Sequence, residues 1–92
     1  MNLLSLHSPH EVQLVLAEFV RARRKALKWS REELARRSTV PAPTIKRFEL
    51  SGEISLRQLL LLWQCVDDVE RIADLCVLPK AKAPGSIEEV LR

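Results

Sequence analysis

Residues 29–63, WSREELARRSTVPAPTIKRFELSGEISLRQLLLLW, decide the fold of this chain. The spacing of their apolar residues predicts two short helices joined by a tight turn and followed by a third helix. Ser30 and Glu33 form the Ser-x-x-Glu pattern of a helix start, and Ser51-Gly52-Glu53 marks a break. The stretch therefore predicts a helical array with short connections.

The same kind of helix start recurs outside this stretch. Ser8-Pro9-His10-Glu11 offers a capping box with Pro at the first helical position. Ser55/Gln58 and Ser86/Glu89 repeat the pattern, and Asp67/Glu70 imitates it with an Asp cap. Only two Gly residues and no strand-like alternation indicate an all-α chain. We predict helices over residues 9–27, 31–37, 42–50, 56–66 and 68–78, in a domain spanning 8–78, with 79–92 as a flexible linker and short docking segment.

The charge of the chain is unevenly placed. The total is +3, but residues 1–50 carry ten Lys/Arg against five Asp/Glu, and residues 51–92 carry five against seven. A basic half and a mildly acidic half suggest different partners. A solvated charged surface explains the asymmetry about equally well, and the cations at 21–25 also suit the C-terminus of a helix.

Several classes of protein are excluded by what the sequence lacks. Cys65 and Cys76 lie eleven apart with no His nearby, which is not a zinc spacing, so we expect buried free thiols. His7 and His10 suggest no metal site. The apolar run at 59–63 is too short to span a bilayer, and no secretory signal opens the chain. With no nucleophile–base set or phosphate loop, we expect a cytoplasmic protein that is not an enzyme and has no cofactor, metal or small-molecule substrate.

The spacing between residues 34 and 48 carries the functional prediction. Leu34 and Ala35 form the inner face of one helix, with Val40 in the turn and Ile45 and Phe48 on the inner face of the next. Such positions hold two helices at the angle used for insertion into a DNA groove, which is a helix-turn-helix. The outward side chains of the second helix, Thr44, Lys46 and Arg47, suit a major groove. Trp29 and Trp63 are expected in the core.

The stretch VRARRKALKWSREELARRS…TIKRFELSG, which begins at Val20, resembles the Xre/Cro-type (lambda-repressor-like) helix-turn-helix family of bacterial and phage regulators. The resemblance covers roughly residues 12–77 and implies a five-helix domain that binds palindromic operators in double-stranded DNA as a homodimer. In the family, Arg24 and Glu33 occupy positions that often pair structurally. The resemblance implies DNA contacts by Arg31, Arg36, Ala42, Pro43, Thr44, Lys46 and Arg47.

Four residues depart from the family pattern. Thr39 stands where Gly is usual, and a positive φ is costly for a β-branched residue, so the turn is expected to be altered. Lys28 stands where Gly often closes the first helix. Pro41 replaces a Ser or Thr cap, and Pro43 lies in the first turn. Base readout is therefore expected to depend on Thr44, Lys46 and Arg47.

The last two helices of the predicted domain carry more apolar residues than one core face needs. We expect Leu56, Leu59, Leu60 and Trp63 to face the core and the remaining apolar residues to form an interface between two copies. The predicted homodimer interface consists of Leu61, Leu62, Val69, Ile72, Leu75 and Cys76.

The C-terminal segment suggests a second partner. A linker followed by an amphipathic segment with Ile87, Val90 and Leu91 is typical of a docking peptide. In size, tail and architecture the chain resembles HipB-class antitoxins. That resemblance implies a repressor of its own operon that binds a HipA-like kinase toxin. A stand-alone Xre-type or phage-type regulator fits nearly as well, and a protein-interaction module that has lost DNA binding remains an alternative.

Overall fold

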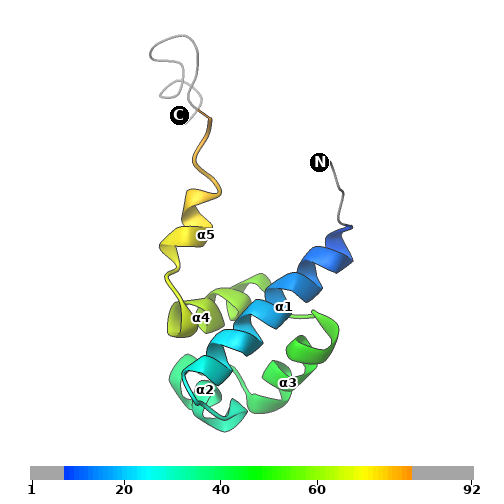
Figure 1. Cartoon of the computed structure of the whole chain (residues 1–92), viewed down its shortest axis with the longest axis vertical. Helices are drawn as coiled ribbons and strands as arrows, with labels where there is room; N and C mark the ends of the chain where they lie inside the picture. Colours follow the sequence, from blue (N-terminus) through cyan, green and yellow to red (C-terminus); the bar gives the residue numbers. More distant parts are fainter. Residues whose placement is uncertain (1–7, 80–92) are drawn as a thin grey trace.

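Five helices and no strands make up residues 8–79, the part of the chain that the computed structural model describes. Figure 1 shows α1 lying across α2, α3 and α4, with α5 projecting away from them. The predicted all-α fold is therefore confirmed. The expected docking residues Ile87, Val90 and Leu91 lie outside the described residues. The helices are α1 (Pro9–Ala26), α2 (Arg31–Ser38), α3 (Ala42–Ser51), α4 (Leu56–Val66) and α5 (Glu70–Asp74).

Three of the helices begin at the serine caps that the sequence predicts. The Ser8 hydroxyl accepts a hydrogen bond from the Glu11 amide at 3.1 Å, and the Ser8 amide donates to Glu11 Oε1 at 2.8 Å. The hydroxyls of Ser30 and Ser55 each accept from the amide three residues on, at 3.0 and 3.1 Å. These bonds satisfy amides that no helical carbonyl can reach, so the predicted starts of α1, α2 and α4 are confirmed.

The last helix differs from its prediction. α5 spans Glu70–Asp74, much shorter than the expected 68–78, and Asp68 rather than Asp67 accepts from the Glu70 amide, at 2.9 Å. Asp67 instead pairs with Arg71. A short helix depends on packing, and Leu75 beyond its end is 81% exposed. Within residues 8–79, Leu75, Cys76 and Val77 after Asp74 are exposed, so no packing there extends the helix.

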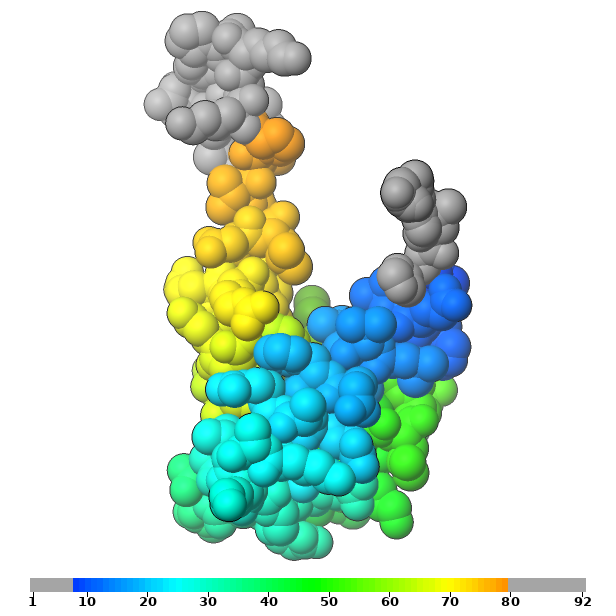
Figure 2. Space-filling view, in the orientation of Figure 1, coloured from blue at the N-terminus to red at the C-terminus, as the bar shows by residue number. Residues whose placement is uncertain are grey.

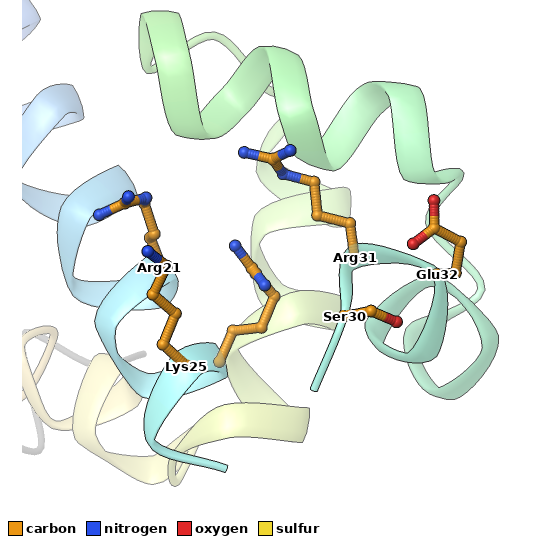
Figure 3. Close-up of a pocket in the computed structure, with 6 residues that line it drawn as sticks. Arg21, Lys25, Ser30, Arg31 and Glu32 are labelled. Carbon is orange, nitrogen blue, oxygen red and sulfur yellow. The ribbon is translucent and has the colours of Figure 1, made fainter. Parts of the chain in front are cut away.

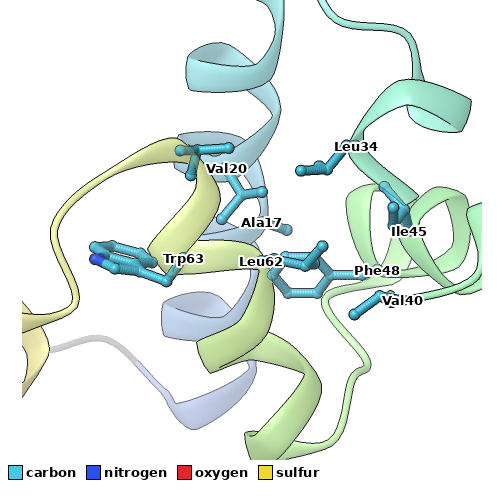
Figure 4. Close-up of a cluster of buried hydrophobic side chains, with 9 residues drawn as sticks. Ala17, Val20, Leu34, Val40, Ile45, Phe48, Leu62 and Trp63 are labelled. Atoms are coloured by element: carbon cyan, nitrogen blue, oxygen red, sulfur yellow. The ribbon is translucent and has the colours of Figure 1, made fainter. Parts of the chain in front are cut away.

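A core of nine buried apolar residues joins α1 to α4 (Figure 4). The expected inner positions Leu34, Val40, Ile45 and Phe48 all belong to it, and so does Trp63. The core residues are Ala17, Val20, Leu34, Val40, Ile45, Phe48, Leu62, Trp63 and Val66.

Trp63 links the core to the start of α5. Its ring stacks on Phe19 of α1 with 4.8 Å between centroids, and its Nε1 donates to the Asp68 carbonyl at 3.1 Å. From α1, Arg23 Nε donates to the Val66 carbonyl at 2.9 Å, which satisfies a carbonyl at the end of α4. The end of α4 is therefore fixed to α1.

The buried face of α4 is rotated from the expected one. Leu62, expected at a dimer interface, is fully buried, whereas Leu56, expected in the core, is 71% exposed. The core face is Leu59, Leu62, Trp63 and Val66, which satisfies the helical spacing as well as the predicted set does. Four consecutive leucines offer several equally apolar faces, so the spacing alone could not select one.

The apolar stripe of α1 is only partly covered. Val12 and Val15 were expected to face the core but are 43% and 56% exposed, while Ala17 is buried. Helical spacing puts both valines on the side of Phe19, which meets Arg71 of α5. In Figure 2 a notch separates α5 from the first turns of α1. Because α5 is short and projects away, it leaves these valines open.

Gly52 fixes the junction between α3 and α1. Its φ of +80° ends α3 in the left-handed region, and a Cβ there would lie 3.0 Å from Gln13 Cβ. Gln13 Nε2 also donates to the Gly52 carbonyl at 3.1 Å. Both the backbone conformation and the close approach therefore require glycine.

The cysteines are free, but they are not both buried. Cys65 is half-buried, and burial raises the pKa of its thiol despite the opposing charge of Arg37; Cys76 is exposed, contrary to expectation. Residues 8–79 hold no group of side chains suited to a metal ion. None of their helices is both long and apolar enough to cross a membrane.

Candidate nucleic-acid interface

The turn between α2 and α3 keeps its left-handed residue although glycine is replaced. Thr39 has a φ of 66°, so the expected alteration of the turn is wrong. The Thr39 amide donates to the Ala35 carbonyl at 2.8 Å, and the Val40 amide donates to the buried Ser38 hydroxyl at 3.1 Å. With Val40 itself buried, the surrounding contacts hold Thr39 in a conformation that costs about 1–2 kcal/mol for a residue with a side chain.

The connection from α1 to α2 shows the same substitution. Lys28 occupies the position of the usual glycine with a φ of 62°. The Trp29 amide donates to the Arg24 carbonyl at 3.1 Å and the Lys28 amide to the Lys25 carbonyl at 2.9 Å, the pattern of a Schellman motif. Both ends of α2 are thus joined by tight turns built without glycine.

A buried carboxylate holds α1, α2 and α3 together. Glu49 of α3 accepts from Arg24 Nε at 2.8 Å and from Arg24 Nη2 at 3.0 Å, and Arg31 Nε of α2 donates to the same carboxylate at 3.0 Å. Arg24 also donates to the Trp29 carbonyl at 2.9 Å. Arg24 is structural, as expected, but its partner is Glu49 and not Glu33, because α3 and not α2 faces this part of α1.

The ionised state of Glu49 depends on these two arginines. Burial alone would raise the pKa of this carboxyl, but hydrogen bonds from Arg24 and Arg31 outweigh it and hold the pKa below its usual value. The Glu49 side chain has no exposed surface, whereas that of Arg31 is one-third exposed. Arg31 therefore connects the buried carboxylate to the surface.

Glu33 organises the other cations of α2. Hydrogen bonds from Arg36 and then Arg37 lower the pKa of Glu33, although its slight burial opposes them. Arg37 also lies over the Trp29 ring at 4.3 Å from its centroid. Arg36, an expected DNA contact, is exposed and held along its own helix by Glu33. Exposed pairs of this kind are weak, so Arg36 can exchange partners at little cost.

The outward face of α3 carries the remaining expected contacts. Lys46 is exposed and makes no hydrogen bond or ion pair within residues 8–79. Arg47 is exposed but pairs with Glu53 at 2.8 Å, and Thr44 is half-buried. Lys46 is thus available to a ligand on this face of α3. Arg47 must first break its ion pair with Glu53 before it can contact a ligand.

The first turn of α3 offers few donors. Pro41 precedes the helix without a side-chain cap, and neither Pro41 nor Pro43 has an amide hydrogen. Ala42 is half-buried and Pro43 exposed. This end of α3 is therefore stiff and largely apolar, unlike a helix start that binds anions through its amides.

Two hollows flank the start of α2. The first, of about 400 Å³, is lined mainly by cations from α1 and α2, and Figure 3 shows Arg31 reaching toward α1 while Glu32 points away. The second, of about 450 Å³, lies between α2 and the start of α3 and shares Arg31 and Glu32 with the first. The first is lined by Arg21, Arg24, Lys25, Ser30, Arg31 and Glu32, and the second by Arg31, Glu32, Ala42, Pro43 and Lys46.

Comparison with known families agrees with this geometry. Residues 20–62 match the helix-turn-helix family HTH_3, and the match begins in α1 and ends in α4. Residues 20–62 thus form a helix-turn-helix domain of the Xre/Cro type. Membership in this DNA-binding, non-enzymatic family implies a transcriptional regulator. No significant match was found among curated proteins or among solved structures.

The residues expected at the interface between two copies differ in how exposed they are. Leu62 belongs to the core and is removed from the set. Leu61, Val69 and Ile72 are half-buried, and Leu75 and Cys76 are exposed. An apolar groove of about 280 Å³ runs beside them along α4 to the start of α5. It is lined by Leu56, Arg57, Leu60, Leu61, Gln64 and Val69.

Sequence reasoning identified the outward residues of α3 but missed Glu49 as the centre of the network. A signal for it was present. Glu49 follows Phe48 and lies four residues after Ile45, so helical spacing puts it beside the buried face. An acid in that position must find a buried cation, and Arg24 is the buried cation of α1.

Proposed function

We propose that this protein is a sequence-specific DNA-binding repressor that inserts α3 into the major groove. The observation that carries the proposal is the fixed guanidinium of Arg31. Its Nε is bound to buried Glu49, while its two terminal nitrogens make no hydrogen bond within the described part of the chain. An arginine held in this way presents a preoriented donor pair to a phosphate.

The cations around Arg31 support contact with the DNA backbone. Arg21 and Lys25 of α1 line the same hollow, and Lys46 lines the neighbouring one. Phosphate contacts from several elements fix the register in which a helix enters the groove. The residues that we propose to contact DNA are Arg31, Arg36, Ala42, Pro43, Thr44, Lys46 and Arg47.

We further propose a homodimer that binds a palindromic operator. Its interface would use the apolar groove of α4 and the exposed residues that follow α5. A two-fold axis between two copies would place two α3 helices about one DNA turn apart. The proposed interface residues are Leu61, Val69, Ile72, Leu75 and Cys76.

For the physiological role we propose an autorepressing antitoxin of a HipA-like kinase toxin. The support is the sequence of the C-terminal segment, in which Ile87, Val90 and Leu91 form an apolar stripe after a Pro- and Gly-containing linker. Such a regulator acts on DNA in the cytoplasm. A chain lacking residues 80–92 should then no longer bind the toxin but should still bind the operator. Retained toxin binding would contradict the docking role of this segment.

One observation favours a competing function, that of a protein-interaction module without DNA binding. Pro41 before α3 and Ala42 and Pro43 at its start carry no side-chain donors. The two functions differ in their prediction for DNA, so binding to duplexes selected from a random pool separates them.

The test of DNA binding compares two lysines. Lys46→Ala should weaken binding to a selected duplex and reduce the slope of log K against log salt by about 0.9, because one phosphate contact is lost. Lys80→Ala removes the same charge at a position after α5 in the sequence. It should leave the affinity for the duplex and the salt slope unchanged. Arg47→Ala should weaken binding or relax base preference. Equal behaviour of the two lysine variants would contradict the proposed orientation of α3.

A further inference from the structure

The two hollows beside α2 differ in chemistry although they share two residues. The first is lined by four cations, Arg21, Arg24, Lys25 and Arg31, and by the Ser30 cap. The second contains the apolar surface of Ala42 and Pro43, with Arg31, Lys46 and Glu32 around it. The same stretch of surface is thus strongly cationic on one side and largely apolar on the other.

Glu32 places a negative charge at the rim of the second hollow, beside Arg31 and Lys46. Its carboxylate is exposed, and within residues 8–79 it has no hydrogen bond or ion pair. In Figure 3 it points away from Arg21 and Lys25, the cations of the first hollow. The apolar surface of Ala42 and Pro43 therefore lies beside a carboxylate that repels a phosphate but can accept a hydrogen bond from the amino group of a base.

The apolar part of the second hollow is rigid and lacks donors. Pro43 is exposed in the first turn of α3, and its ring fixes the local backbone. Ala42 beside it is half-buried and presents only a methyl group. In the major groove the apolar feature of a base pair is the C5-methyl of thymine, and alanine is among the residues that contact it.

We propose that Ala42 and Pro43 form a subsite for the C5-methyl group of thymine, which makes them specificity-determining residues of α3. This inference rests on the proposed DNA binding. It specifies which chemical group of a base the first turn of α3 recognises. Glu32 at the rim accepts a hydrogen bond from an exocyclic base amine and disfavours the carbonyl-rich edge of guanine. The first turn of α3 thus selects thymine by its shape and by contact with its methyl group.

The experiment removes only the methyl group. The duplex is first selected by the full-length protein from a random pool, and each thymine is then replaced in turn by deoxyuridine. We expect about fourfold weaker binding at one or two thymines per half-site, the effect of losing one buried methyl group. Pro43→Ser should bind the uracil and thymine duplexes equally, whereas Lys46→Ala should keep the fourfold preference with weaker overall binding.

The outcomes separate this proposal from DNA binding itself. Tight binding that no deoxyuridine replacement changes would overturn the methyl subsite and leave the repressor proposal standing. An unchanged preference for thymine in both Pro43→Ser and Ala42→Gly would overturn the assignment to these residues. If no duplex is selected at all, the proposed DNA binding fails and the subsite fails with it.

Discussion

The end of the molecule that carries α2 and α3 and the end that carries α5 are held in opposite ways. Glu49 ties α1, α2 and α3 together through hydrogen bonds from two arginines, and left-handed residues fix the turns. At the other end α5 is short, and Leu75 and Val77 are among the most exposed apolar residues described. The fold thus makes the end that we propose to contact DNA rigid and leaves the apolar residues at the other end exposed.

The strongest way to break the rigid end is to remove its carboxylate. Glu49→Ala would leave Arg24 buried without its charged partner, and losing one partner of a buried pair costs about 3–5 kcal/mol. Urea unfolding of the variant beside the wild type measures this loss. Glu53→Ala, which removes an exposed carboxylate paired with Arg47, is the matched control and should cost below about 1 kcal/mol. Similar costs for the two variants would refute the central role of Glu49.

The next largest effect is expected at the junction of α3 with α1. Gly52→Ala places a Cβ 3.0 Å from Gln13 Cβ at a φ of +80°, so it should destabilise the fold by about 2 kcal/mol. Thermal unfolding measures the change.

Thr39→Gly tests the same backbone argument with the opposite sign. Thr39 already has a φ of 66°, and glycine there relieves strain at the cost of chain entropy, for a net gain of roughly 0.5–1 kcal/mol. If both substitutions shift the unfolding temperature in the same direction, the conformational argument fails.

Acid should loosen the rigid end. Because the folded state lowers the pKa of Glu49 below its ordinary 4.5, this contribution to stability is fully present above that pH. It is lost as the pH falls through the lower pKa of the folded protein. Unfolding free energies measured from pH 6 to pH 3 should decline less steeply for Glu49→Gln than for the wild type. Parallel curves would mean that other groups govern the acid response.

At the open end the smallest effect on stability is expected. Leu75→Asp changes a side chain that is 81% exposed, so the unfolding free energy should move by less than about 0.5 kcal/mol. Self-association measured by analytical ultracentrifugation should nevertheless weaken, because the charge enters the proposed interface. Glu70→Gln, five residues earlier in α5, is the control. Unchanged association of the Leu75 variant would exclude this residue from the interface.

Local patterns predicted most of the rigid end. The serine caps correctly predicted three helix starts. The spacing of Leu34, Ile45 and Phe48 correctly predicted the packing of α2 on α3. These features depend on near neighbours in the chain. The pairing of Arg24 with Glu49 depends on how α1 crosses α3, which no local pattern contains.

Uniform apolar composition explains the failures at the other end. Residues 59–62 are all leucine, so several faces of α4 satisfy the same spacing, and the predicted one placed Leu56 inside and Leu62 outside. The length of α5 was overestimated for a related reason. Leu75, Val77 and Leu78 continue a helical pattern, but a pattern forms a helix only where a surface exists to bury it.

The salt dependence of binding to a selected duplex tests the central claim most directly. If the four cations among the proposed contacts, Arg31, Arg36, Lys46 and Arg47, each neutralise a phosphate, log K should fall with log salt with a slope of about −3.6 per copy of the protein. Affinity should then drop roughly a hundredfold per copy between about 50 and 200 mM salt. A flat response with negligible binding would contradict the assignment of the rigid end as a DNA-binding surface.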